Sequence, residues 1–89
     1  MKIVGLVKRP YDSEFNGRRY TGNNYIIYYE KSVTDNGVGV TCNSIKVKED
    51  VINKLLSEYN IDDYTELLDY VIDDVYYDEY KRVKSVVLK

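Results

Sequence analysis

Histidine and tryptophan are absent from this 89-residue sequence, and cysteine and proline occur only once each. Without histidine the chain lacks the commonest general base and metal ligand, and Cys42 has no imidazole to convert it into a thiolate. Ser-His and Cys-His catalysis are therefore excluded, and we expect a protein that is not an enzyme. A lone cysteine cannot form an internal disulfide, so Cys42 is predicted to be a small buried side chain.

Long apolar runs are missing as well. A membrane-spanning helix needs about 20 consecutive apolar residues, whereas Lys8 and Arg9 end the first apolar run of this chain. The same two cations make that run too short for the core of a signal peptide. The sequence therefore predicts no membrane segment and a cytoplasmic location.

The acidic residues are numerous, but they do not follow a metal-binding pattern. The Asp-x-Asp-x-Asp-Gly order of a calcium loop, with its distal Glu, does not occur. The segment Gly37-Val-Gly-Val40 lacks the lysine of a phosphate-binding loop. We expect neither a metal site nor a cofactor, and these glycines are predicted to allow a strand to curve.

What the chain does contain is a globular composition with an uneven distribution of charge. Hydrophobic residues make up 44% and charged residues 31%, which indicates one folded domain over residues 1–89. The net charge is +4 over residues 1–48, −10 over residues 49–80 and +4 over residues 81–89. The two basic ends are therefore where we expect a phosphate-bearing ligand.

Two strands joined by a tight turn are predicted at the start of the chain. The first covers residues 2–8 and ends at Arg9-Pro10, a pair that cannot continue a central strand. Asn16-Gly17 is typical of a two-residue hairpin, because both positions of a type I′ turn need positive φ. The second strand is predicted over residues 18–30, with a bulge or bend at Gly22.

A turn at residues 35–37 leads to a third strand over residues 38–48, after which the period of the apolar residues changes. Residues 49–72 carry two apolar stripes at helical spacing, which predict two short helices. Asn60 is the expected end of the first helix, and Asp63-Tyr-Thr-Glu66 has the form of a capping box for the second.

Two further strands, near residues 75–77 and 82–88, complete the pattern. Five strands with a helical segment between the third and the fourth match the connectivity of the OB-fold. We therefore expect a mainly β fold, a small five-stranded OB-like curved barrel with its helical segment at about residues 49–72. The alternative is an α+β domain in which two helices cover one face of an open antiparallel sheet.

Eleven tyrosines stand out in a chain of this length. Tyr59 and Tyr64 lie on the helical stripes and are expected in the core, as is one member of each of the pairs Tyr28/Tyr29 and Tyr76/Tyr77. The other rings stand close to cations, and proteins that hold single-stranded nucleic acid combine cationic grooves with aromatic faces. The candidate nucleic-acid-binding residues are Arg9, Tyr11, Arg18, Arg19, Tyr20, Tyr28, Tyr77, Tyr80, Arg82 and Lys84.

Two segments, residues 37–47 and Val75-Tyr-Tyr-Asp-Glu-Tyr-Lys-Arg-Val-Lys-Ser-Val-Val-Leu88, resemble small single-stranded DNA-binding proteins of Gram-positive phages and plasmids. In that family the last hairpin carries a Tyr-Tyr-Asn-Arg-Tyr-Gly-like turn, which Tyr76, Tyr77 and Tyr80 match and Asp78, Glu79 and Lys81 do not. The resemblance implies an OB-like barrel, often a homodimer, that coats single strands during replication or recombination in a bacterial host cell. The acidic pair weakens the expectation of phosphate contact at the turn.

The sequence thus predicts an accessory protein that binds single-stranded nucleic acid, DNA above all, with little sequence preference. The alternative is an inhibitor that mimics nucleic acid and binds a protein partner through residues 62–79, which hold eight carboxylates and no cation. A small assembly protein that pairs through its edge strands is a third hypothesis.

Overall fold

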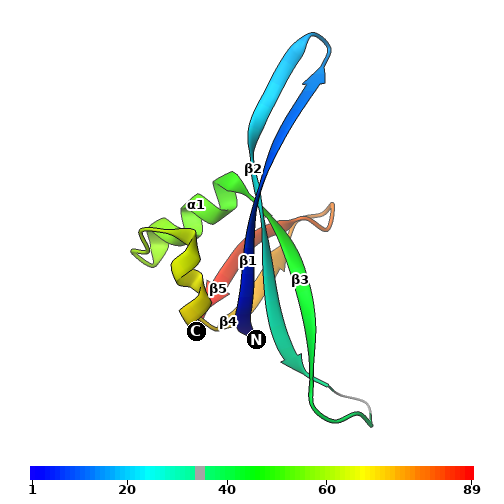
Figure 1. Ribbon diagram of the computed structural model, residues 1–89, viewed down its shortest axis with the longest axis vertical. Coiled ribbons are helices and arrows are strands. Elements are labelled where there is room, and N and C mark those ends of the chain that lie inside the picture. The colour runs from blue at the N-terminus through cyan, green and yellow to red at the C-terminus, as the bar shows by residue number, and fades with distance from the viewer. Residues whose placement is uncertain (34–35) are drawn as a thin grey trace.

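The computed structural model describes residues 1–33 and 36–89, which form five strands and two short helices (Figure 1). The elements follow the predicted order of three strands, a helical segment and two strands. Their bounds are β1 Lys2–Phe15, β2 Arg18–Ser32, β3 Val40–Lys48, α1 Glu49–Glu58, the 3₁₀ helix η1 Tyr64–Asp69, β4 Ile72–Tyr77 and β5 Val83–Leu88.

Strands β1, β2 and β3 form an antiparallel sheet in that order. Asn16 and Gly17 have φ values of 52° and 74°, as a type I′ turn requires, so the predicted hairpin is confirmed. The predicted end of the first strand at Arg9-Pro10 is wrong, because β1 continues through Pro10, which lies opposite Asn23. Proline is tolerated there because β1 is an edge strand.

The irregularity predicted at Gly22 lies elsewhere. Tyr11 and Gly22 are regular cross-strand partners, and the shift in register falls between Ile3 and Gly5, where β1 contains the extra residue Val4. What distinguishes residue 22 is the Tyr11 side chain, which lies where a Cβ would be close to it, as described below. The predicted turn at residues 35–37 includes Asp35, which lies outside the described residues, while Asn36 has a φ of 71°.

The two helices end and begin where the sequence predicts. Asn60 has a φ of 53°, and the Ile61 amide donates to the Leu56 carbonyl at 2.8 Å, which closes α1 with a Schellman motif. The capping box of η1 is present, since Asp63 accepts from the backbone and Glu66 reaches back to the N-cap amide. Helix η1 is nevertheless a 3₁₀ helix of six residues rather than an α-helix.

The prediction of a closed barrel is wrong for the part of the chain that the structure describes. Strands β4 and β5 form a second antiparallel sheet, separate from the sheet of β1, β2 and β3. The start of β1 meets the start of β4 through one isolated bridge, Lys2 with Val71, and the Ile72 amide donates to the Met1 carbonyl at 2.7 Å. The fold is mainly β, with open sheets and two helices, and is closer to the α+β alternative.

The core lies between the two sheets and α1. Strand β2 contributes Tyr25 and Ile27 and strand β3 contributes Ile45 and Val47, so alternate residues of each strand point inward. The remaining buried side chains are Ile3, Ile52, Leu55, Ile61, Leu67, Ile72, Val86 and Leu88.

Two tyrosines pack against the core as the helical stripes predict. The rings of Tyr64 and Tyr25 meet edge to face with centroids 5.2 Å apart, and the Tyr59 hydroxyl accepts from the Leu88 amide at 3.0 Å. The prediction of a buried cysteine is wrong. The odd-numbered residues Ile45 and Val47 of β3 point into the core, so the even-numbered Cys42 points outward and is exposed.

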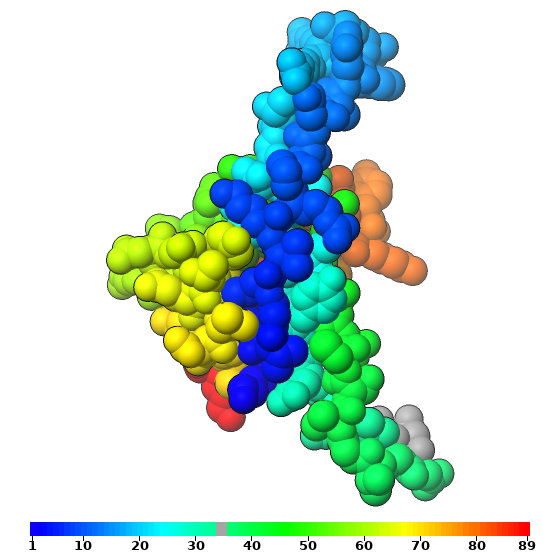
Figure 2. Space-filling view, in the orientation of Figure 1, coloured from blue at the N-terminus to red at the C-terminus, as the bar shows by residue number. Residues whose placement is uncertain are grey.

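The molecule is elongated, with principal extents of 52 × 30 × 23 Å. Residues 9–22, which we call the arm, form a two-stranded ribbon that projects from the body (Figure 1). The turn between β4 and β5 projects from another side, and both projections stand clear of the body in the space-filling view (Figure 2). These two projections frame the candidate site.

Candidate functional site

The sheet of β1, β2 and β3 has one face against the core and an outer face turned away from it. Directly opposed residues of neighbouring antiparallel strands share a face, and so do residues two apart along one strand. The register therefore defines the outer face row by row. From the middle of the sheet to the arm tip, the rows are Gly5·Tyr28·Ser44, Val7·Ile26·Lys46, Arg9·Asn24·Lys48, Tyr11·Gly22, Ser13·Tyr20 and Phe15·Arg18. In the other direction the same face continues through Lys2·Glu30·Cys42 and Ser32·Val40.

Over the six rows from Gly5 to the arm tip, this outer face combines aromatic rings with positive charge. Its rings are those of Tyr28, Tyr11, Tyr20 and Phe15. Its cations are Arg9, Arg18, Lys46 and Lys48, and all four are exposed. None of the residues in these rows, every one of which the structure describes, is an aspartate or glutamate. Same-face rows are about 6.8 Å apart along a strand, so the six rows run for roughly 34 Å before twist is considered.

Two of the rings lie over glycines of the neighbouring strand. A Cβ at residue 22 would lie 2.7 Å from the Tyr11 hydroxyl and 2.9 Å from its Cζ. A Cβ at residue 5 would lie 3.4 Å from the Cβ of Tyr28 and 3.5 Å from its Cδ2. Each ring therefore rests on the backbone across the ladder, which leaves Tyr11 exposed and Tyr28 half-buried.

The opposite face of the arm differs in its charge. Arg19 lies there and forms an ion pair with Asp12, donating from Nε to Oδ1 at 2.9 Å and from Nη2 to Oδ2. The hydrogen bond from Arg19 lowers the pKa of the Asp12 carboxyl, and the same bond raises the pKa of the guanidinium. Arg18 and Arg19 are thus neighbours in sequence on opposite faces of the ladder.

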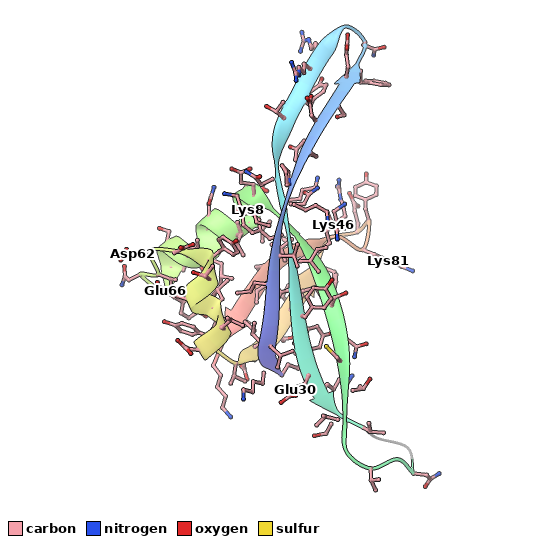
Figure 3. All side chains as sticks on the ribbon, viewed as in Figure 1. Lys8, Glu30, Lys46, Asp62, Glu66 and Lys81 are labelled. Carbon is pink, nitrogen blue, oxygen red and sulfur yellow. The ribbon has the colours of Figure 1, made fainter. Side chains whose placement is uncertain are left out.

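A groove of about 910 Å³ opens between the edge of β3, the base of the arm and the β4–β5 turn. The aromatic lining comes from Tyr11 and Tyr77 and the cationic lining from Lys46, Lys48, Lys81 and Arg82. Lys46 and Lys81 lie on the same side of the molecule, one on β3 and one on the turn (Figure 3). The lining also includes two carboxylates, Glu49 and Asp50.

Glu49 is engaged with the sheet. Its Oε2 accepts from the Asn23 backbone amide at 2.8 Å and from the Asn23 side chain at 3.5 Å. Asn23 lies just beyond the last β2–β3 pair, Asn24 with Lys48. The carboxylate therefore accepts a hydrogen bond from a β2 amide that has no partner on β3. One of the two carboxylates in the groove, that of Glu49, is therefore hydrogen-bonded to the backbone at the end of the β2–β3 ladder.

The β4–β5 turn is organised by Asp78. Its Oδ1 accepts from the amides of Tyr80 and Arg82, both at 2.9 Å, and its Oδ2 accepts from Arg82 Nε at 3.1 Å. These bonds lower the pKa of the Asp78 carboxyl, the Arg82 amide contributing most. The Arg82 guanidinium carbon lies 5.0 Å from the centre of the Tyr80 ring.

The structure gathers most of the predicted binding residues on adjoining surfaces. The outer face holds Arg9, Tyr11, Arg18, Tyr20 and Tyr28, and the groove adds Tyr77 and Arg82 to Tyr11. Tyr80 stands at the turn beside Arg82.

Two predicted residues do not join this set. Arg19 lies on the other face of the arm, paired with Asp12, and Lys84 lies beside α1 with Lys54 rather than in the groove. The expectation that one member of the Tyr76/Tyr77 pair is buried is also wrong, because these side chains are 52% and 54% exposed.

The sequence reasoning missed three lysines of the groove, Lys46, Lys48 and Lys81. A signal for the first two was present, since the alternation Ile45-Lys46-Val47-Lys48 indicates a strand with one apolar and one cationic face. Lys81 could not be found this way, because it depends on a turn in which Lys81 adopts a φ of 64°.

Comparison of the chain with protein-family models, with curated proteins and with solved structures found no match. Within residues 1–33 and 36–89, neither helix has the length and hydrophobicity needed to cross a membrane. The same residues contain no group of three His, Cys, Asp or Glu side chains placed to hold a metal ion.

Proposed function

We propose that this protein binds single-stranded nucleic acid, DNA above all, with little sequence preference. The observation that carries the proposal is the part of the outer face from Tyr28 to Arg18, on which four cations and four aromatic rings occur in six successive rows without a carboxylate. The nearest carboxylate of this face, Glu30, lies in the row beyond Tyr28 and opposite Lys2. Surfaces of this kind hold the phosphate backbone by charge and the bases by stacking, and stacking does not require a particular base.

The groove supports the same function at the base of the arm. There the outer-face residues Tyr11, Lys46 and Lys48 line the groove together with Tyr77 of β4 and Lys81 of the β4–β5 turn. A strand lying along the outer face would enter this groove, where cations from both sheets are within reach of its phosphates. A duplex offers no unpaired base to the rings, so stacking favours the single strand.

The proposal includes the role implied by the resemblance noted above. The protein would act as a phage- or plasmid-type accessory factor of replication or recombination in the bacterial cytoplasm, as a homodimer.

The test is fluorescence anisotropy of a labelled oligothymidine, single-stranded and then annealed to its complement, titrated at several salt concentrations. We expect salt-sensitive binding to the single strand, with a log-log slope of about −0.7 for each phosphate contact. Four contacts from the outer-face cations would give a slope of about −3. No binding at about 100 µM protein, the weak end of non-specific affinities, would contradict the proposal.

The inhibitor hypothesis has weaker support. Of the eight carboxylates in residues 62–79, those of Asp63, Glu66, Asp74 and Asp78 accept hydrogen bonds from nearby backbone amides. Those four acidic groups therefore have local structural uses. Replacing Asp69 and Asp73, which are exposed, with asparagine distinguishes the two functions, because single-strand binding should persist and binding to a basic protein should not.

A further inference from the structure

We propose that Asp78 positions Tyr80 and Arg82 as a preformed platform on the β4–β5 turn, whose ligand is an unpaired, planar base. The inference rests on the proposed function, because the base would belong to the bound single strand. In this platform Arg82 supports the Tyr80 ring instead of contacting a phosphate. Asp78, although acidic, then favours binding because it holds Arg82 and the turn in place.

The turn that carries the platform is closed by five hydrogen bonds centred on Asp78. Besides the three bonds to its carboxylate, the Asp78 amide donates to the Arg82 carbonyl at 2.9 Å and the Asp78 carbonyl accepts from Lys81 at 3.1 Å. The turn accommodates this closure by placing Lys81 at positive φ. The backbone at residues 80–82 is therefore fixed before any ligand arrives.

The same carboxylate fixes the side chain of Arg82. Its Oδ2 holds Arg82 Nε, and the guanidinium carbon lies 5.0 Å from the centre of the Tyr80 ring, within the range of a cation–π contact. Tyr80 nevertheless remains 69% exposed. One side of Tyr80 is thus supported by a planar cation that is itself anchored, and the rest of the ring is open to solvent.

A ring held in this way binds a base at low entropic cost. A free tyrosine on a turn would lose side-chain rotamers when a base stacks on it, whereas a supported ring has already lost them. The cation below the ring also offsets the carboxylate charge, so that Asp78 does not repel the nucleic acid as strongly as an unpaired aspartate would. Lys81, which lines the groove, is left to meet phosphate.

The experiment compares two ligands of the same charge. One is an oligothymidine of about twelve nucleotides, within the range of site sizes known for small domains that bind single strands. The other has the same sugar-phosphate backbone without bases. Both are titrated with wild-type protein and with the variants Asp78→Ala, Asp78→Asn, Tyr80→Ala and Lys81→Ala.

We expect Tyr80→Ala and Asp78→Ala to weaken binding of the oligothymidine by about tenfold, the scale of one stacked base, and to change binding of the abasic strand by less than twofold. Lys81→Ala should weaken both ligands equally. Asp78→Asn should fall between wild type and Asp78→Ala, because its amide oxygen can still accept from the backbone. Charge alone predicts the opposite for Asp78→Ala, since removal of a carboxylate would strengthen binding of both ligands.

Two outcomes separate this inference from the function on which it rests. If wild-type protein binds neither ligand, the proposed function fails and the platform loses its ligand. If wild-type protein binds the oligothymidine but Asp78→Ala binds it equally well or better, the platform is overturned and single-strand binding stands. An NMR readout needs no ligand: the side-chain protons of Arg82 should be shifted by the Tyr80 ring, and Tyr80→Ala and Asp78→Ala should each abolish that shift.

Discussion

The hydroxyl end of Tyr11 lies over Gly22, so close that a Cβ on residue 22 would come within 2.7 Å of the hydroxyl oxygen. The two residues are cross-strand partners at the base of the arm, and Tyr11 also lines the groove. Glycine at this position therefore lets an aromatic ring lie down on the ladder at the point where the outer face meets the groove.

Gly22→Ala should move that ring and weaken single-strand binding. The methyl group cannot share the space of the Tyr11 side chain, and loss of one stacking contact corresponds to about fivefold or more in affinity. Gly5→Ala is the matched control, since its Cβ would meet Tyr28 at an ordinary 3.4 Å and neither glycine has positive φ. Anisotropy titrations measure both; equal effects would show that the Tyr11 contact is unimportant.

Arg18 and Arg19 should differ although they are adjacent in the sequence. Arg18→Ala removes a cation from the outer face and is expected to flatten the salt dependence by about 0.7 in log-log slope, one phosphate contact. Arg19→Ala breaks the pair with Asp12 on the other face and should leave the slope unchanged. Salt titrations of the two variants give the answer, and the reverse ranking would refute the assignment of the faces.

The pKa of Asp78 gives the turn a defined response to pH. The folded state holds this pKa below the ordinary value of 3.8, so the carboxylate contributes stability above that value and the contribution is lost as the pH falls through the folded pKa. We expect the turn to stay organised at pH 4 and to open only in stronger acid. Carbon-13 NMR of the aspartate carboxyls measures the titration, and a midpoint for Asp78 at or above 3.8 would contradict the hydrogen-bonding scheme.

The end of α1 depends on the left-handed conformation of Asn60. Asn60→Ala should lower the free energy of unfolding by about 1 kcal/mol, because a Cβ without a hydrogen-bonding group disfavours positive φ. Asn60→Gly should be neutral or slightly stabilising, since glycine is the residue most often found there. Urea unfolding distinguishes the two variants, and equal losses from both would mean that the asparagine side chain itself is needed.

The two isoleucines in the middle of β2 test the direction of the strand. Ile27 is fully buried and Ile26 is partly exposed on the outer face. Ile27→Ala is expected to cost about 2–5 kcal/mol of unfolding free energy, and Ile26→Ala about 1 kcal/mol. Chemical denaturation measures both. A larger loss at Ile26 would place the core on the other side of the sheet.

Local signals in the sequence were sufficient for the turns and helix ends. Asn16-Gly17, Asn60 and the capping box of Asp63 each depend on a few neighbouring residues, and each has the conformation that its residues favour. The closure of the sheets depends on contacts between distant segments. A single bridge between Lys2 and Val71 links the first strand to the second sheet, and no local pattern specifies whether such a link extends into a ladder.

In the candidate site, too, local sequence signals predict some features and contacts between distant segments determine the others. The Asn16-Gly17 turn fixes the register of β1 and β2, and this register places Arg9, Tyr11 and Tyr20 on one face. The same register places Arg19 opposite Glu14 with Asp12 one row away on the same face, so it does not by itself select the diagonal ion pair of Arg19 with Asp12. The groove could not be predicted, because it requires the β4–β5 turn to stand beside β3, which only the packing of the two sheets determines.

The contact between Glu49 and Asn23 also bears on how this protein avoids aggregation. Beyond Asn24 the second strand loses its β3 neighbour, and an open strand edge of this kind is the usual starting point for fibril growth. At the first such position the backbone amide is already occupied by a carboxylate, at 2.8 Å. An incoming chain would have to displace a charged side chain before it could add to the sheet there. Glu49 therefore hinders strand addition at the edge where the arm leaves the body.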